Sequence, residues 1–253
     1  MSLNEREDLT MNTDRIALVT GANKGLGFET SRGLAQQGVL VLMGCRNATK
    51  GRAAAKELQK TGLNVEFMRL DVTKPEQIKA AAAEIKKRFK KLDILVNNAG
   101  VSVGENLAQN STETVSLKAL RQTFDVNFFG LVELTRALLL LLKKSESGRI
   151  VNVSSILASL AIHSKEGGMS YKPFAYDATK TAVNAFTIHL AAALVGTNIK
   201  VNSAHPGWVK TDMGGPNAPL SPAEGAKTAV WLATLGPDGL TGKFFHNQEE
   251  LPW

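Results

Sequence analysis

The sequence predicts an α/β protein built on a doubly wound sheet of about seven parallel strands, with helices on both faces. Two observations support this prediction. Short apolar runs rich in β-branched residues alternate along the chain with longer segments of helical composition. A cluster of glycines also separates the first apolar run from the helical segment after it. Right-handed crossovers between such strands place the helices on both faces of one sheet.

Seven segments are predicted strands, at residues 16–19, 39–45, 65–70, 94–96, 149–153, 199–203 and 243–245. The predicted helices cover residues 28–37, 48–59, 75–89, 117–144, 174–195 and 222–235, and a start near Phe124 is the alternative for the fourth. The third begins with Pro75 and ends in basic residues, as helix termini prefer. Residues 102–114 and 157–173 are predicted loops.

The length fits one large α/β domain or two small ones, and because no linker interrupts the chain we expect one domain over residues 14–253, preceded by a flexible extension at 1–13. The chain has 253 residues, of which 43% are hydrophobic, and no apolar run approaches a membrane span. Its net charge of +7 is spread over predicted helix faces, which favours solvated surfaces over a nucleic-acid partner. A single cysteine, Cys45, and a polar N-terminus without a secretory signal predict a cytoplasmic protein.

The first glycine cluster has the form of a dinucleotide cradle. Gly21, Gly25 and Gly27 lie between a predicted strand and a predicted helix. Glycines allow a tight turn and a close approach of a diphosphate, and the helix N-terminus supplies N–H donors. Other polar clusters follow the later strands, at Asp71-Val72 and at 97–100, for example. Parallel sheets bind ligands at this edge.

A candidate catalytic pair begins the fifth predicted helix. Tyr176 and Lys180 are four residues apart, so they share one helix face. A lysine ammonium there lowers the pKa of a phenol, which can then exchange a proton with a carbonyl or alcohol oxygen. Ser155 could donate to the same oxygen, and Asn127 could hold a water behind Lys180. The alternatives are a plain surface pair for Tyr176 and Lys180, a helix N-cap for Ser155 and a core amide for Asn127.

Other reactive residues do not form a site of their own. Tyr171 is followed four residues later by alanine rather than lysine. The four histidines are scattered without a cysteine partner or a close pair, so no metal site is predicted. The chain contains no G-x-S-x-G motif, which argues against an α/β-hydrolase.

Taken together, these motifs resemble the short-chain dehydrogenase/reductase family over nearly the whole chain. The resemblance rests on residues 20–27, 97–100, Asn127, Ser155, Tyr176-x-x-x-Lys180 and Pro206-Gly207. It implies a Rossmann fold, a nicotinamide cofactor and a catalytic tetrad of Asn127, Ser155, Tyr176 and Lys180. It also implies a set of cofactor-binding residues: Gly21, Asn23, Lys24, Gly25, Leu26, Gly27, Arg46, Asp71, Val72, Asn98, Ala99, Gly100, Tyr176, Lys180, Pro206, Gly207, Val209 and Thr211.

One departure from the common family pattern suggests a subgroup. Ser155 and Tyr176 are 21 positions apart, a longer gap than usual, and the extra residues within 157–173 resemble a shortened carbonyl-reductase insertion. Ser155 is preferred over Ser154 as the tetrad serine. In carbonyl reductases the insertion covers a helix face used for assembly, so a monomer is expected here, with a dimer as the alternative.

The end of the second strand predicts the form of the cofactor. Cys45 and Arg46 stand where NAD-binding proteins usually carry an acidic residue. Arg46 and Lys24 could both bind a 2′-phosphate, so NADPH is predicted. The expected function is NADPH-dependent reduction of a small-molecule ketone or aldehyde, with Tyr176 as general acid. The alternatives are an oxidative NAD(P)-dependent alcohol or steroid dehydrogenase and a catalytically silent nucleotide sensor.

Overall fold

The structure is a computed structural model that describes residues 15–103, 110–167 and 173–253. The predicted extension at 1–13 and Tyr171 therefore lie outside the described residues. The strands are β1 (Ile16–Thr20), β2 (Leu40–Cys45), β3 (Val65–Arg69), β4 (Ile94–Asn97), β5 (Arg149–Val153), β6 (Lys200–Ala204), β7 (Phe244–His246) and β8 (Glu249–Glu250). The helices are α1 (Gly25–Ala35), α2 (Ala48–Gln59), α3 (Pro75–Phe89), α4 (Leu117–Phe124), α5 (Gly130–Leu142), α6 (Leu160–His163), α7 (Phe174–Ala193) and α8 (Pro222–Ala233).

The eight strands among the described residues form one sheet in the order β3-β2-β1-β4-β5-β6-β7-β8. The pairs from β3 through β7 are parallel, which confirms the predicted doubly wound fold. The added strand, β8, pairs antiparallel with β7. Its two residues are both exposed glutamates, and the turn before it holds Asn247 and Gln248 at positive φ without a glycine. The usual sequence signals of a hairpin are therefore lacking.

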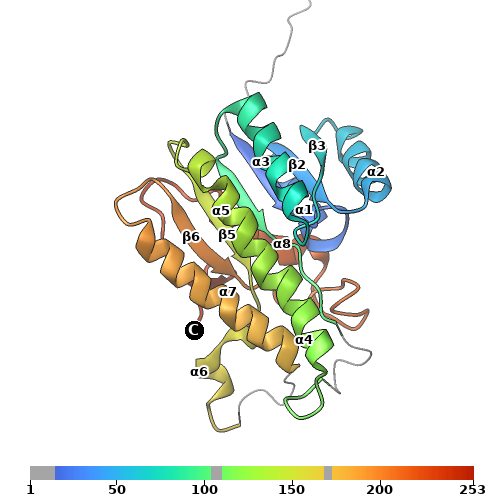
Figure 1. Cartoon of the computed structure of the whole chain (residues 1–253), viewed down its shortest axis with the longest axis vertical. Helices are drawn as coiled ribbons and strands as arrows, with labels where there is room; N and C mark the ends of the chain where they lie inside the picture. The colour runs from blue at the N-terminus through green and yellow to red at the C-terminus, as the bar shows by residue number, and fades with distance from the viewer. Residues whose placement is uncertain (1–14, 104–109, 168–172) are drawn as a thin grey trace, which may run out of the picture.

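Each inner strand is buried on both faces, as parallel sheets between helices require. In β1, Ala17 and Val19 join the apolar cluster beneath α1, α2 and α8. Ile16 and Leu18 join the second cluster, which packs against α3, α5 and α7. Figure 1 shows these last three helices running across the front of the sheet. The apolar runs of the sequence are thus the two-sided core of the molecule.

The predicted long helix at 117–144 is interrupted near the site. Between α4 and α5, residues Asp125–Phe129 form a π-helical turn. Such turns are frequent at functional sites. The amide of Asn127 lies within this turn and is 1% exposed.

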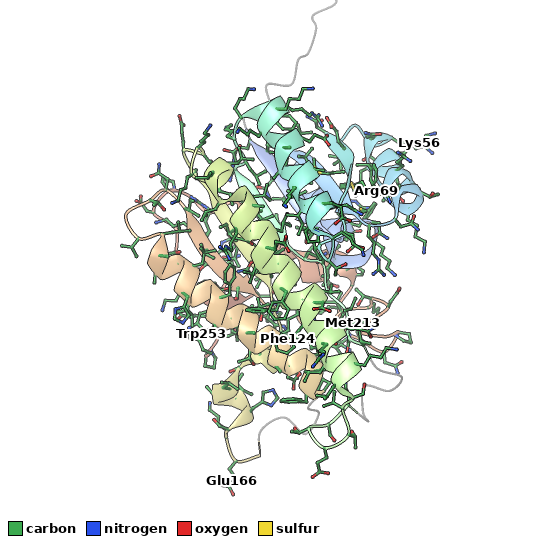
Figure 2. The ribbon with its side chains drawn as sticks, in the orientation of Figure 1. Lys56, Arg69, Phe124, Glu166, Met213 and Trp253 are labelled. Atoms are coloured by element: carbon green, nitrogen blue, oxygen red, sulfur yellow. The ribbon has the colours of Figure 1, made fainter. Side chains whose placement is uncertain are left out.

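The predicted loop at 157–173 contains short helices. A 3₁₀ turn, Ile156–Ala158, follows β5, and α6 comes directly after it. The C-terminal residue, Trp253, anchors this region (Figure 2): its ring stacks on Phe244 and its carbonyl accepts a hydrogen bond from the Ala161 N–H at 2.9 Å. The segment around α6 is therefore fastened to β7 through Trp253.

Candidate functional site

The carboxyl ends of β1 and β4 are joined by hydrogen bonds at one edge of the sheet. The Thr20 hydroxyl accepts from the backbone N–H groups of Asn98 and Ala99, at 3.0 and 2.9 Å. The Asn98 side-chain amide donates to the Thr20 carbonyl at 2.8 Å. The glycine turn and the segment 97–100 are therefore joined side by side, as expected if both belong to the predicted cofactor site.

The start of α1 approaches these two joined segments closely at Gly27. A Cβ atom at that position would lie 2.4 Å from the Gly21 carbonyl oxygen and 2.5 Å from the Asn98 amide nitrogen, so only glycine fits. The N-terminus of α1 has no side-chain cap and no acidic residue in its first turn. Its N–H groups and positive dipole end suit an anionic group such as a diphosphate.

The two cations predicted to bind a 2′-phosphate are placed differently. Arg46 is exposed at the end of β2, one residue before Asn47, which caps α2. Lys24 forms an ion pair with Asp212, which belongs to the loop after β6. The side chains of this pair are 64% and 79% exposed, so water screens it and it can exchange partners. In this structure Lys24 thus bridges the glycine turn to the loop after β6.

Two of the predicted cofactor-binding residues, Asp71 and Val72, follow β3. The Asp71 carboxylate accepts from both the backbone N–H and the hydroxyl of Thr73, at 3.0 and 2.8 Å. Val72 is buried, and its carbonyl oxygen would lie 2.5 Å from a Cβ placed on Gly130. The Asp71 side chain therefore stabilises its own turn, and the backbone of 71–72 packs against the start of α5.

Tyr176 and Lys180 share one face of α7, as their spacing predicts. The Lys180 ammonium lies 5.6 Å from the centre of the Tyr176 ring and donates to the Val153 carbonyl at 2.6 Å. Burial lowers the pKa of Lys180 to about 8. Burial also raises the pKa of Tyr176 to about 12, although a hydrogen bond with Ser155 acts in the opposite direction. The predicted lowering of the tyrosine pKa is therefore wrong for this structure, because desolvation outweighs the favourable contacts.

The structure brings Ser155 to Tyr176 and turns Ser154 away from it. The Ser155 hydroxyl lies near enough to Tyr176 to lower the pKa of its phenol, and it accepts from the Leu157 N–H at 3.2 Å. The neighbouring Ser154 hydroxyl points to the Lys180 carbonyl, at 3.5 Å. This geometry agrees with the preference for Ser155 from the sequence.

Asn127 connects the loop after β4 to α7. Its side-chain oxygen accepts from the Val101 N–H at 2.8 Å, and its nitrogen donates to the Val101 carbonyl and to the Thr179 hydroxyl, at 2.9 and 3.1 Å. A Cβ on Gly100 would lie 3.5 Å from the Asn127 oxygen and 3.7 Å from the Lys180 nitrogen. Asn127 and Lys180 thus both lie beside Gly100, while the water expected between them stays a prediction.

The loop after β6 reaches back to the glycine turn. A Cβ on Gly25 would lie 3.3 Å from the Thr211 methyl group. Pro206, together with Leu26, Asn98 and Val153 among others, lines a small hollow at the sheet edge. Val209 is buried, and its carbonyl accepts from the Thr211 hydroxyl at 3.4 Å. The predicted residues of this loop therefore face the same edge as the glycine turn.

A larger cavity, of about 380 Å³, lies on another side of α7. It is lined by Asp177, Ala178 and Thr181, which point away from the face of Tyr176 and Lys180. Leu157 and Leu160 form the opposite wall. This cavity is therefore separate from the predicted catalytic centre.

His205 occupies a position that its place in the sequence, where it was weighed only as a metal ligand, did not reveal. It follows β6 and precedes Pro206, and its ring accepts hydrogen bonds from the N–H groups of Ile156 and Gly207. The sequence signal that could have indicated this position is its place between the end of a predicted strand and Pro206-Gly207. Across the described ranges, no group of three or more histidine, cysteine, aspartate or glutamate side chains could hold a metal ion. The described helices include none long and apolar enough to cross a membrane.

Comparison with known proteins agrees with this geometry. The family described as short chain dehydrogenase matches residues 15–219. Mouse (Mus musculus) carbonyl reductase (NADPH) 1 is 34% identical, covering 94% of this chain and 98% of its own length. Short-chain dehydrogenase/reductase 1 of Saponaria officinalis is 35% identical, covering 94% and 96%. The NADPH-bound structure of carbonyl reductase from chicken fatty liver is 30% identical with a TM-score of 0.81, covering 94% and 99%.

A doubly wound sheet with a glycine cradle and a buried Ser-Tyr-Lys cluster at its carboxyl edge defines a nucleotide-dependent oxidoreductase. The chain belongs to the short-chain dehydrogenase/reductase family. The resemblance predicted from the sequence motifs is therefore confirmed.

Proposed function

We propose that the protein is an NADPH-dependent carbonyl reductase in which Tyr176 is the general acid. The observation that carries this proposal is the cluster of Ser155, Tyr176 and Lys180 at the carboxyl edge of the sheet. Relatives named carbonyl reductase (NADPH), which match nearly the whole chain, support the same activity.

The protonation states of the cluster favour reduction. With a pKa of about 12, Tyr176 carries its proton at neutral pH and can give it to a carbonyl oxygen. The Ser155 hydroxyl is close enough to Tyr176 to donate to that same oxygen. With a pKa of about 8, Lys180 is mainly charged at pH 7 and stabilises the phenolate that the transfer leaves behind. Alcohol oxidation needs the phenolate at the outset, so this arrangement supports it less well.

The residues of the glycine turn fit a dinucleotide. The N–H groups of α1 would hold its diphosphate, Gly27 gives it access to the backbone, and the loop containing Thr211 would cover its nicotinamide. When bound, the nicotinamide of this dinucleotide supplies the hydride. Arg46, and Lys24 after release from Asp212, would hold a 2′-phosphate, which is why we infer NADPH rather than NADH.

The assembly and location of the protein are also proposals. We infer a monomer, with a dimer as the alternative, because the insertion packs on α7: the Thr181 hydroxyl donates to the Ala158 carbonyl at 3.0 Å. A cytoplasmic location is supported by the single cysteine, which is buried. Light scattering and cell fractionation test the two proposals, and a tetramer would contradict the first.

The function is tested with a panel of ketones, aldehydes and quinones under NADPH and NADH. We expect NADPH oxidation that depends on a carbonyl compound and a lower kcat/KM with NADH. Turnover of alcohols with NAD⁺ that exceeds every carbonyl reduction would contradict the proposal. Failure of all carbonyl compounds, despite NADPH binding measured by its fluorescence, would favour a silent nucleotide sensor.

A further inference from the structure

The ring of His205 joins two turns that come from different strands. Its Nδ1 atom accepts from the Ile156 N–H at 3.2 Å and from the Gly207 N–H at 3.3 Å. Ile156 follows Ser155 directly, and Gly207 lies in the loop predicted to contact the nicotinamide. One imidazole nitrogen is therefore shared between the proposed catalytic turn and the proposed cofactor loop.

Two N–H donors that share one nitrogen fix the protonation state and the tautomer of the His205 ring. Nδ1 must be unprotonated to accept them, so the proton of the neutral ring is on Nε2. Burial and the neighbouring His246 lower the pKa of His205 to about 3, which agrees with a neutral ring. His205 therefore serves as a hydrogen-bond acceptor toward both turns over the whole working pH range.

The neighbouring contacts hold the cofactor loop against this acceptor. Gly207 has a φ of +83°, and a Cβ there would lie 2.5 Å from a Leu220 methyl group and 3.1 Å from the His246 ring. The Nδ1 atom of His246 is 3.0 Å from the His205 carbonyl oxygen, to which it donates. The two histidine rings lie 4.8 Å apart between centroids. The Gly207 N–H thus has little freedom to find another acceptor inside the protein.

We propose that His205 is a positioning residue, whose Nδ1 sets the Ser155 turn relative to the Pro206–Gly207 turn. The inference rests on the proposed roles of Ser155 and of this loop. Ser155 approaches Tyr176 from β5, while the loop approaches the glycine turn from β6, and the Ile156–His205–Gly207 bridge links them across these strands. Misplacement of a reacting group by about 1 Å lowers turnover by about 100-fold.

The test compares side chains that offer an acceptor at different places. Asparagine puts its oxygen the same number of bonds from the backbone as Nδ1, glutamine puts it one bond further, and leucine has none. We expect His205→Leu and His205→Gln to lower kcat for carbonyl reduction by about tenfold or more, while His205→Asn restores most of it. The Kd for NADPH, read by fluorescence without a carbonyl substrate, should change by less than about threefold, because the diphosphate site is untouched.

A second arm combines His205→Leu with Ser155→Ala. If His205 acts through Ser155, the double variant should be within about threefold of Ser155→Ala alone, since coupled residues are not additive. The proposal would be overturned if the losses of kcat in the two single variants multiplied in the double variant. It would also be overturned by equal rates for His205→Asn and His205→Gln. Loss of the folded state in both His205→Leu and His205→Gln, judged by thermal melting, would overturn it too, because the residue would then serve the fold.

The single variants Ser155→Ala and His205→Gln separate the proposed catalytic site from the proposed role of His205. Near-normal turnover of Ser155→Ala would refute the proposed catalytic site itself. An impaired Ser155→Ala beside a fully active His205→Gln would refute only the role of His205.

Discussion

Lys180, a proposed catalytic residue, has an unfavourable location for a charge. It is 4% exposed, and its ammonium donates to a backbone carbonyl, that of Val153, rather than to a carboxylate. Burial alone accounts for the lowering of its pKa from 10.5 to about 8. At 1.36 kcal/mol for each pH unit, the folded protein at pH 7 bears a cost of about 3 kcal/mol for keeping this lysine charged.

The pH dependence of this cost has a definite sign. Below pH 8 both the folded and the unfolded chain carry the proton, so the whole cost is present. Between pH 8 and 10.5 the unfolded chain binds more protons than the folded one, so stability rises with pH. Replacing Lys180 by methionine removes this titration, and it also leaves the Val153 carbonyl without its donor, which costs about 1–3 kcal/mol.

We therefore expect Lys180→Met to be as stable as the wild type, or more stable, at pH 7. Between pH 7 and pH 10 the free energy of unfolding should rise by about 2.5 kcal/mol more in the wild type than in the variant. Urea unfolding of the cofactor-free protein at both pH values measures this difference. Lys86→Met, on the exposed surface of α3, is the matched control and should follow the wild type. Identical pH slopes for Lys180→Met and the wild type would refute the reasoning.

Three further predictions concern Arg46, Asp212 and Ser155. Arg46→Asp should lower kcat/KM for NADPH by about tenfold or more and spare kcat/KM for NADH, because a carboxylate repels the 2′-phosphate. Equal losses with both cofactors would show that Arg46 only stacks on the adenine. Asp212→Asn should tighten NADPH binding by about two- to fivefold by releasing Lys24, and an unchanged Kd would mean that Lys24 does not reach the phosphate. Ser155→Ala should raise the pKa of Tyr176 further and lower kcat by about 10²–10³, whereas Ser154→Ala, the adjacent control, should retain more activity.

The sequence predicted the inner strands β1, β2 and β4 because each is an apolar run, buried on both faces. It also placed Tyr176 and Lys180 on one face, since helical spacing is a local property. The bounds of the helices were less predictable: the π-helical turn around Asn127 follows from packing between distant segments. The same limit applies to β8, whose two glutamates carry no strand pattern.

The electrostatics of the site depended on tertiary burial. The i, i+4 spacing of Tyr176 and Lys180 predicted a lowered tyrosine pKa, but enclosure by the surrounding protein raises it. The Lys24–Asp212 ion pair joins residues from opposite ends of the chain, which a local pattern cannot reveal. His205 likewise became a functional candidate only when Ile156 and Gly207 were seen to meet at its ring.

The most direct test of the account is turnover by Tyr176→Phe with NADPH and the best carbonyl substrate. The change removes the acidic hydroxyl and keeps the ring, so kcat should fall by about 10²–10⁴ while the Kd for NADPH stays near the wild-type value. Tyr171→Phe, the chain's other tyrosine, is the matched control and should remain active. Near-normal kcat in Tyr176→Phe, with the control also active, would contradict the assignment of Tyr176 as the general acid.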